Sequence, residues 1–161
     1  MQHVSIVCIG KLNQAFYASG VAEYTKRLSA FCRFEITELP EEAIDEKNAS
    51  AALIDMALKK EAAKILDAVP RNAQLVSLCI EGKQLTSENF SKWLENAAIA
   101  GCGTVAFVIG SSHGLADSIK QKSTLRLSLS GMTFPHQLAR LMLTEQIYRA
   151  FTIRAGSKYH K

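Results

Sequence analysis

The sequence contains no long apolar run, and this absence limits the class of protein that it can encode. No segment approaches the roughly 18 consecutive apolar residues that a membrane-spanning helix requires, which argues against an integral membrane protein. The first residues, MQHVSIVCIGK, lack the basic start, apolar stretch and small-residue cleavage site of a secretory signal. We therefore expect a cytoplasmic protein with a β-strand near its N-terminus and no membrane partner.

Cysteine is also sparse, and its spacing argues against a metal site. The four residues are Cys8, Cys32, Cys79 and Cys102, and no two of them form a CxxC pair. Because a zinc site needs clustered ligands, we expect no metal. Cys8 and Cys79 lie in apolar, strand-like segments, which favours reduced and buried thiols in a cytoplasmic protein.

The composition indicates a single globular domain over residues 1–161. Apolar residues make up 48% of the chain and charged residues 21%, which is typical of a folded protein with a sizeable core. The net charge of +4 does not by itself indicate a nucleic-acid partner, but cations are concentrated near the C-terminus. From residue 140 onward the chain has one acidic residue, Glu145, and five cations, which are Arg140, Arg149, Arg154, Lys158 and Lys161.

Apolar periodicity predicts strands and helices in strict alternation. The expected strands cover residues 3–10, 33–39, 74–80, 104–110 and 125–129, and the expected helices cover 14–31, 50–69, 87–100, 114–122 and 135–155. This alternation is typical of an α/β fold, with a mostly parallel sheet and helices on both of its faces. The uniformly apolar segment TVAFVI is expected to form a central strand.

Several residues are suited to the ends of these helices. We expect Asn48 to cap the second helix, and Thr86 or Ser87 to cap the third. Gly101 suits the position just beyond the third helix, and Pro135 suits the first position of the last helix. The last helix is apolar on most of its surface, so it needs more than one partner surface, and we expect a central position and a dimer interface.

The glycine turn after the fourth strand, Gly110 to Gly114, is open to three interpretations. It lacks the GxGxxG pattern of dinucleotide-binding folds and the GxxxxGK[ST] pattern of P-loops. It matches the G-x-S-x-G nucleophile elbow, in which Ser112 would be a hydrolase nucleophile. It also suits a tight structural turn, or a turn whose backbone amides cradle a ligand. The downstream triad partners of Ser112 would be Asp117 or Glu145 and His136 or His160.

The segment LSLSGMTF, residues 127–134, has an unusual composition for a connection after a strand. Its small residues, Ser130, Gly131 and Thr133, let a ligand approach the backbone closely. Its apolar residues suit the wall of a pocket for a flat aromatic ring; they are Leu129, Met132 and Phe134. The alternative is an ordinary strand-to-helix connection with its cap.

Five pieces of sequence occur in a fixed order and carry a family resemblance. They are Gly82-Lys83 after the third strand, VIG at 108–110, LSLSxMTxPHQLxR at 127–140, EQxYRAFxI at 145–153, and the final YHK. In these pieces the whole chain resembles the RlmH family, SPOUT-class methyltransferases of the large ribosomal RNA. The resemblance implies an α/β fold with a C-terminal trefoil knot, although chains in general avoid knots.

The resemblance also implies a reaction and its partners. It implies a homodimeric enzyme that uses S-adenosyl-L-methionine to methylate N3 of a pseudouridine in 23S rRNA of the assembled ribosome. The implied donor-binding residues are Leu78, Gly110, Leu129, Ser130, Gly131, Met132, Thr133 and Phe134. The implied substrate-binding residues, acting across the dimer interface, are Arg149, Tyr159, His160 and Lys161.

Three of the substrate-side residues have implied catalytic roles. His160 is the candidate general base. Arg149 would stabilise the developing anion or bind a phosphate, and Tyr159 would stack on the target base or on its neighbour. The chain departs from the family at Ser111, where a second glycine is common, and at His113, where an acidic residue or tyrosine is frequent. A non-catalytic ribosome-binding module with a basic tail is the alternative from another functional class.

Overall fold

The computed structural model describes residues 1–101 and 103–161, so the expectation for Cys102 lies outside the described residues. The strands are β1 (His3–Ile9), β2 (Arg33–Leu39), β3 (Gln74–Gln84), β4 (Thr104–Ile109) and β5 (Leu125–Ser128). The α-helices are α1 (Ala15–Leu28), α2 (Ala51–Ala68), α3 (Ser87–Ile99), α4 (Asp117–Lys122) and α5 (His136–Arg154). Two 3-10 helices, η1 (Glu46–Asn48) and η2 (Lys158–His160), complete the described elements.

The five strands form one parallel sheet in the order β2-β1-β4-β3-β5. β4 lies at the centre, and its residues Val105 to Val108 are fully buried, as the apolar segment TVAFVI predicts. The expected α/β fold with a parallel sheet is therefore confirmed, and the trefoil knot stays a prediction.

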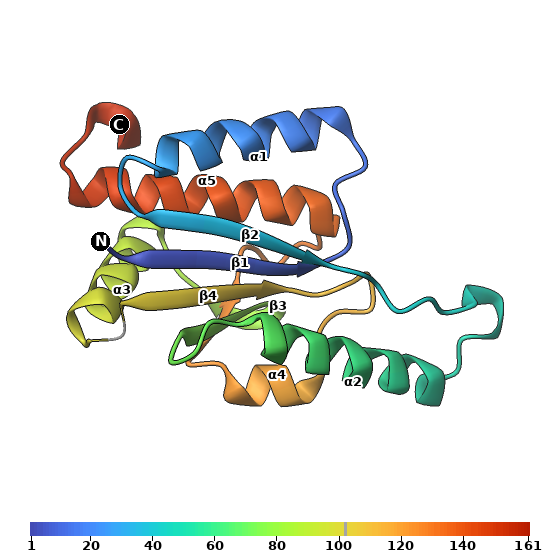
Figure 1. Cartoon of the computed structure of the whole chain (residues 1–161). Helices are drawn as coiled ribbons and strands as arrows, with labels where there is room; N and C mark the ends of the chain where they lie inside the picture. Colours follow the sequence, from blue (N-terminus) through green and yellow to red (C-terminus); the bar gives the residue numbers. More distant parts are fainter. Residues whose placement is uncertain (102) are drawn as a thin grey trace.

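Helices cover both faces of the sheet (Figure 1). On one face, α1, α3 and α5 pack on side chains such as Val4, Ile6 and Phe107. On the other face, α2 and α4 pack on the alternate side chains, including Val7 and Val108. This division follows from the alternation of side chains along each strand.

Helix α5 is the central helix of its face. Leu143, Ile147 and Ala150 have no exposed surface, and the helix contacts both α1 and α3. Its apolar residues therefore meet the sheet and two neighbouring helices, which confirms the predicted central position. The dimer interface that the sequence also predicts is not tested by a single chain.

Several helix ends differ from the sequence predictions by one or two residues. Ser50, not Asn48, caps α2, because its hydroxyl accepts a hydrogen bond from the Leu53 amide. Asn48 instead belongs to η1. Pro135 is the residue before α5 and not its first residue. Thr86 caps α3, and positive-φ Gly101 follows it, as predicted.

Strand β3 is longer than predicted and changes its pairing with β5. The sequence predicts a turn after residue 80, but β3 continues to Gln84. The register with β5 shifts between Leu78 and Lys83, so the intervening residues bulge away from regular pairing. Gly82 fits only because it lacks a side chain: a Cβ there would lie 2.8 Å from the Arg126 backbone.

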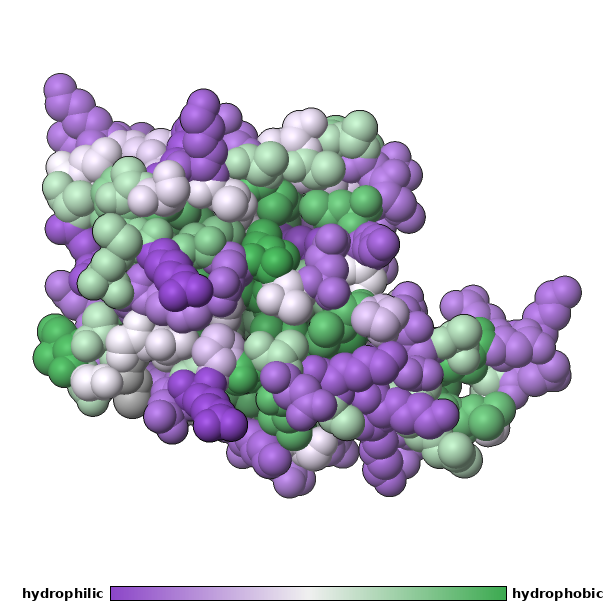
Figure 2. Space-filling model, in the orientation of Figure 1, coloured by the Kyte–Doolittle hydropathy of each residue, from purple (hydrophilic) through white to green (hydrophobic). Residues whose placement is uncertain are grey.

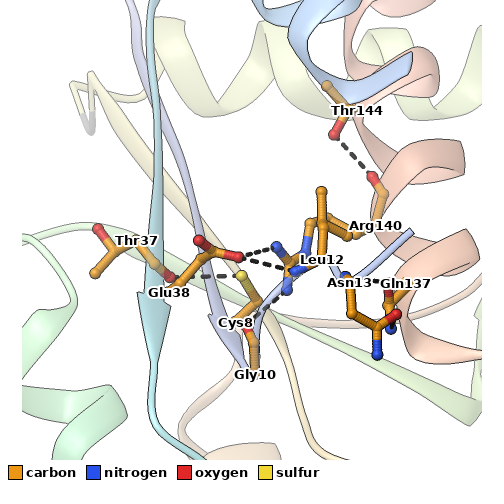
Figure 3. Close-up of polar contacts among 9 residues, drawn as sticks. All are labelled: Cys8, Gly10, Leu12, Asn13, Thr37, Glu38, Gln137, Arg140 and Thr144. Atoms are coloured by element: carbon orange, nitrogen blue, oxygen red, sulfur yellow. Dashed lines mark hydrogen bonds and ion pairs between the residues drawn. The ribbon is translucent and has the colours of Figure 1, made fainter. Parts of the chain in front are cut away.

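A buried arginine ties the start of α5 to the carboxyl ends of β1 and β2 (Figure 3). Arg140, which is 1% exposed, donates to Glu38 Oε2 at 2.6 Å and to the Gly10 carbonyl at 2.9 Å. The Glu38 carboxylate also accepts a hydrogen bond from the Leu12 amide. Because charged hydrogen bonds are strong when shielded from water, this contact fixes where α5 begins.

Segment η1 and the first turns of α2 project from the rest of the molecule as an arm (Figure 1). Apolar surface lies among hydrophilic side chains on this arm in Figure 2, and Leu53 and Met56 are 47% and 55% exposed. Within the described residues, no helix combines the length and apolar character that crossing a membrane requires.

Candidate functional site

A cavity of about 700 Å³ lies at the carboxyl ends of β3, β4 and β5. Three segments line it: Leu78 to Glu81 of β3, where the strand departs from regular pairing with β5; the glycine turn after β4; and the connection from β5 to α5. In a parallel sheet these strand ends meet at one edge, which is where α/β folds place their ligands. The size is typical of a pocket for a small molecule.

The predicted donor-binding residues surround this cavity, with one exception. Leu78, Gly110, Leu129, Ser130, Met132, Thr133 and Phe134 all line it. Gly131 is not a lining residue, although it lies within the same loop. The cavity brings together three segments far apart in sequence, and the sequence patterns do not reveal that Ile80, Glu81 and Lys120 also belong to its wall.

The glycine turn is a tight backbone structure. A Cβ on Gly110 would collide with the Gly114 backbone, and Gly114 has a φ of +86°, which favours glycine. The Gly114 amide donates to the Ser111 carbonyl at 2.9 Å. In the described part of the chain, no hydrogen bond joins the Ser112 hydroxyl to a histidine, so the triad of a serine hydrolase is not formed.

The loop after β5 is held by its own serines. The Ser128 hydroxyl donates to the Ser130 carbonyl at 2.9 Å, and the Ser130 hydroxyl accepts from the Met132 amide at 3.0 Å. The Met132 side chain is 74% exposed at the cavity mouth. These local bonds fix the backbone and leave the apolar side chains free to line the cavity.

A buried carboxyl group supports the glycine turn from behind. Glu61 of α2 is 3% exposed, accepts a hydrogen bond from the Ser111 hydroxyl at 3.2 Å, and accepts another from the Glu42 amide. Burial raises the pKa of Glu61, although these two hydrogen bonds oppose the shift. No sequence signal indicates this contact, because an acidic residue in an amphipathic helix ordinarily faces water.

The predicted substrate-side residues Arg149 and Tyr159 meet at Glu145. The Arg149 guanidinium donates to Glu145 Oε1 at 2.6 Å, and the Tyr159 hydroxyl donates to the same oxygen at 3.0 Å. The guanidinium also lies 4.9 Å from the centroid of the Tyr159 ring. Tyr24 of α1 contacts the Tyr159 hydroxyl at 3.2 Å. We call Tyr24, Glu145, Arg149 and Tyr159 the tail cluster.

The tail cluster shifts the ionisation of its members. Burial, followed by hydrogen bonds to Tyr24 and Glu145, raises the pKa of Tyr159 far above its ordinary value. The hydrogen bond to Glu145 raises the pKa of Arg149. Arg149 therefore stays cationic and Tyr159 stays neutral at physiological pH, so the cluster presents a cation and a neutral aromatic ring.

His160 is held by a different helix from Arg149 and Tyr159. Its Nε2 lies 2.7 Å from Glu88 Oε1 in the first turn of α3, and its Nδ1 is buried without a hydrogen-bond partner among the described residues. The pKa of Glu88 is lowered, mainly by a hydrogen bond from the backbone amide of Glu88 itself and secondly by the hydrogen bond to His160. Lys161 is exposed.

The cavity and the tail cluster occupy opposite ends of α5. His136, which lines the cavity, begins the helix, and Arg149 lies near its other end. They are 13 positions apart in the helix, which corresponds to about 20 Å. No residue of the tail cluster lines the cavity, so one chain does not bring the predicted donor and substrate sites together.

Within the described residues, no three His, Cys, Asp or Glu side chains gather in a way that suits a metal ion.

The comparisons with known proteins agree with the observed fold. A solved probable methyltransferase from Bordetella pertussis shares the fold, with a TM-score of 0.54 and 11% identity, over 93% of this chain and 96% of that one. A probable methylase family protein from Haemophilus influenzae gives a TM-score of 0.52 at 12% identity, over 99% of this chain and 71% of that one.

Similarity in sequence extends over nearly the full chain. Ribosomal RNA large subunit methyltransferase H of Streptococcus uberis is 47% identical, covering 98% of this chain and 99% of that protein. The Bacillus thuringiensis protein of the same name is 46% identical, with 99% of both chains covered. The family model for predicted SPOUT methyltransferases matches residues 2–160. Because this model spans nearly the whole chain and the relatives are 46–47% identical to it, the chain belongs to the SPOUT methyltransferase family.

Proposed function

We propose that this protein transfers a methyl group from S-adenosyl-L-methionine to N3 of a pseudouridine in 23S rRNA of the assembled ribosome. The observation that carries this proposal is the arrangement of the predicted site residues. All donor residues except Gly131 line one cavity, and Arg149 and Tyr159 meet at Glu145 near the other end of α5. The names of the relatives support ribosomal RNA as the substrate.

The cavity fits the methyl donor in size and in chemistry. Its volume of about 700 Å³ accommodates a nucleoside with an amino-acid arm. Leu78, Leu129 and Phe134 provide apolar surface for a flat ring. The backbone of the turn at Gly110 and of the loop at Ser130 and Thr133 offers donors and acceptors for the polar groups. Recognition through backbone atoms is consistent with Ser111 at a position where the family commonly has glycine.

A homodimer would complete the site. The tail cluster and the cavity occupy separate stretches of α5 in one chain, with His136 and Arg149 about 20 Å apart along the helix. Pairing two α5 helices in opposite directions would place the tail cluster of one protomer beside the cavity of its partner. The closed two-fold symmetry that most homodimers adopt gives two such composite sites. The trefoil knot of the family and a cytoplasmic location belong to the same proposal.

The reaction requires removal of the N3 proton and alignment of the two substrates. The bound S-adenosyl-L-methionine supplies a methyl group that its sulfonium already activates, so no metal is required. His160 accepts the N3 proton, and such general-base catalysis is worth about 10²–10⁴-fold. Arg149 stabilises the negative charge that develops on the imide, while Tyr159 stacks on the base and Lys161 binds a phosphate.

Removing the last three residues tests this proposal. The chain without residues 159–161 should bind S-adenosyl-L-methionine in calorimetry with unchanged affinity, because none of these residues lines the cavity. It should not methylate ribosomes from cells that lack the enzyme, as measured by mass spectrometry of their rRNA. Normal methylation by the truncated protein would refute the role of the tail.

The same two measurements separate the alternative functions. A non-catalytic ribosome-binding module predicts that the intact, folded protein does not bind S-adenosyl-L-methionine. A serine hydrolase predicts covalent labelling of Ser112 by a fluorophosphonate. The hydrogen bonds of the described residues give Ser112 no catalytic base, so we expect no labelling.

A further inference from the structure

A second cavity, separate from the donor cavity, lies between α3 and the β3–β5 edge of the sheet. Its volume is about 340 Å³, and it is formed by the end of β3, the outer face of α3 and the start of β5. Its lining residues are Lys83, Gln84, Leu85, Asn89, Lys92, Trp93, Asn96 and Leu125. None of these residues lines the donor cavity or belongs to the tail cluster.

The base of this second cavity is apolar and aromatic. Leu85, Trp93 and Leu125 are half-buried, and each packs on its inner side against the main core. Their outer sides line the cavity. Trp93 is the single tryptophan of the chain. A fixed indole that is partly exposed in a polar cavity is a surface on which a nucleobase can stack, with a tolerance for any base.

The rim of the second cavity consists of polar groups with no partners inside the protein. Lys83 and Lys92 are exposed, and neither forms an ion pair with the described residues. The amide side chains of Gln84, Asn89 and Asn96 likewise make no hydrogen bond within that part of the chain. Two cations and three free amides around an apolar floor are suited to a phosphate and the edge of a base.

The acidic residues of α3 do not neutralise these lysines, because the C-terminal segment engages them. Glu88 contacts His160 at 2.7 Å, and Glu95 lies 3.8 Å from Arg154. With both carboxylates directed to the C-terminal segment, the positive charge of Lys92 stays available to an anion. The same contacts connect the second cavity to the predicted substrate side.

The second cavity also lies in line with the candidate base. Asn89, Lys92 and Asn96 are spaced three and four residues apart, so they share one face of α3. Glu88, which holds His160, lies at the start of that face, and eight residues separate it from Asn96. That distance is about 12 Å along the helix, which is within reach of nucleotides that flank a base held at His160.

We propose that the second cavity binds a nucleotide of the ribosomal RNA next to the methylated one. Trp93 stacks on its base, Asn89 and Asn96 contact the base edge, and Lys83 and Lys92 neutralise the adjoining phosphates. The inference rests on the proposed function, since it places this nucleotide beside the target base. It adds a contact that increases affinity for the ribosome without taking part in methyl transfer.

The test compares two double variants that remove the same charge. Lys83→Ala with Lys92→Ala should raise the KM for unmethylated ribosomes about tenfold, while kcat and the affinity for S-adenosyl-L-methionine stay unchanged. The salt dependence of ribosome binding should weaken by about one unit of slope for each lysine. The control, Lys47→Ala with Lys60→Ala, removes two exposed lysines from η1 and α2 on the other face of the sheet and should leave both quantities unchanged.

Ultraviolet crosslinking of the intact protein to these ribosomes identifies the partner. The expected product is an rRNA nucleotide attached to the peptide that contains Trp93. An unchanged KM in the first variant, or a loss equal to that of the control, would overturn the inference. Crosslinks of this peptide to a ribosomal protein alone would also overturn it. If the unmodified protein does not methylate ribosomes at all, the proposed function fails, whereas a Trp93–rRNA crosslink would still support the cavity as an RNA site.

Discussion

The two ends of helix α5 are built in different ways. At its start, the donor cavity is formed by backbone turns, small residues and apolar side chains. At its end, the tail cluster consists of side chains joined by charged hydrogen bonds, with Glu145 Oε1 accepting from both Arg149 and Tyr159. A site made of backbone tolerates exchange of side chains such as Ser111, whereas a site made of side chains depends on each of them.

The difference is consistent with what each end is proposed to bind. The methyl donor is one fixed small molecule, so shape and backbone groups suffice to hold it. The target base belongs to a large anionic RNA, for which cations and aromatic rings are required. Helix α5 carries one proposed site at each end. Substitutions at its start and at its end should therefore affect the two sites separately.

The largest expected effect comes from the anchor at the start of α5. Arg140→Met removes a buried guanidinium and leaves the Gly10 carbonyl without its donor. Because the Glu38 side chain is 39% exposed and can be resolvated, losing this half-buried ion pair costs about 2 kcal/mol, less than for a fully buried pair. We expect a correspondingly lower free energy of unfolding in urea, together with weaker binding of S-adenosyl-L-methionine, because His136 and Ala139 on the same turns line the cavity.

The matched control for this anchor is Arg27→Met. Arg27 pairs with Glu23 at 2.8 Å, but the two side chains are 42% and 52% exposed. Exposed pairs of this kind contribute little to stability, so we expect little change in the unfolding midpoint. If both variants unfolded at the same urea concentration, Arg140 would not be the anchor of the donor end.

The next effect concerns the end of α5. Glu145→Gln preserves the shape of the side chain but replaces charged acceptor bonds to Arg149 and Tyr159 with neutral ones. We expect kcat for ribosome methylation to fall about tenfold, since a loss of about 1.4 kcal/mol in positioning corresponds to that factor. Calorimetry should show unchanged affinity for S-adenosyl-L-methionine.

Asp55→Asn is the corresponding control for the tail cluster, because it alters an exposed i,i+4 pair with Lys59 on α2, on the other face of the sheet. It should leave kcat unchanged. A Glu145→Gln variant with full activity would indicate that Arg149 and Tyr159 do not depend on Glu145. A variant that lost affinity for the donor would indicate that the two ends of α5 are not independent.

The sequence allows the positions of the strands and most of the cavity-lining residues to be predicted. Periodicity locates all five strands, because each strand alternates or is wholly buried, and the small residues of 128–133 indicate the donor loop. Contacts between distant segments have no such pattern. Glu61 meets Ser111 across 50 residues, His160 meets Glu88 across 72, and the end of β3 meets α3 to form the second cavity. Only the packed fold brings these groups together.

Glu61 gives the smallest expected effect, and it depends on pH. Its pKa in the folded protein is raised by burial above the ordinary value of 4.5. Well below pH 4.5 the carboxyl group is protonated in both the folded and the unfolded state, so it does not change the free energy of unfolding with pH. As pH rises, the unfolded chain releases the proton first and binds fewer protons than the folded protein, so the free energy of unfolding decreases. The decrease ends once pH exceeds the raised pKa.

Glu61→Gln should remove this dependence, because the amide keeps hydrogen bonds to Ser111 and to the Glu42 amide without an ionisable proton. Relative to the unmodified protein, the variant should gain stability between pH 4 and pH 7, as urea unfolding would measure. Asp55→Asn, an exposed carboxyl of the same helix, should show no such gain. Donor affinity should stay unchanged, because a backbone-built cavity does not require the charge behind Ser111. A loss of donor binding in Glu61→Gln would show instead that side chains control the donor end as they control the tail cluster.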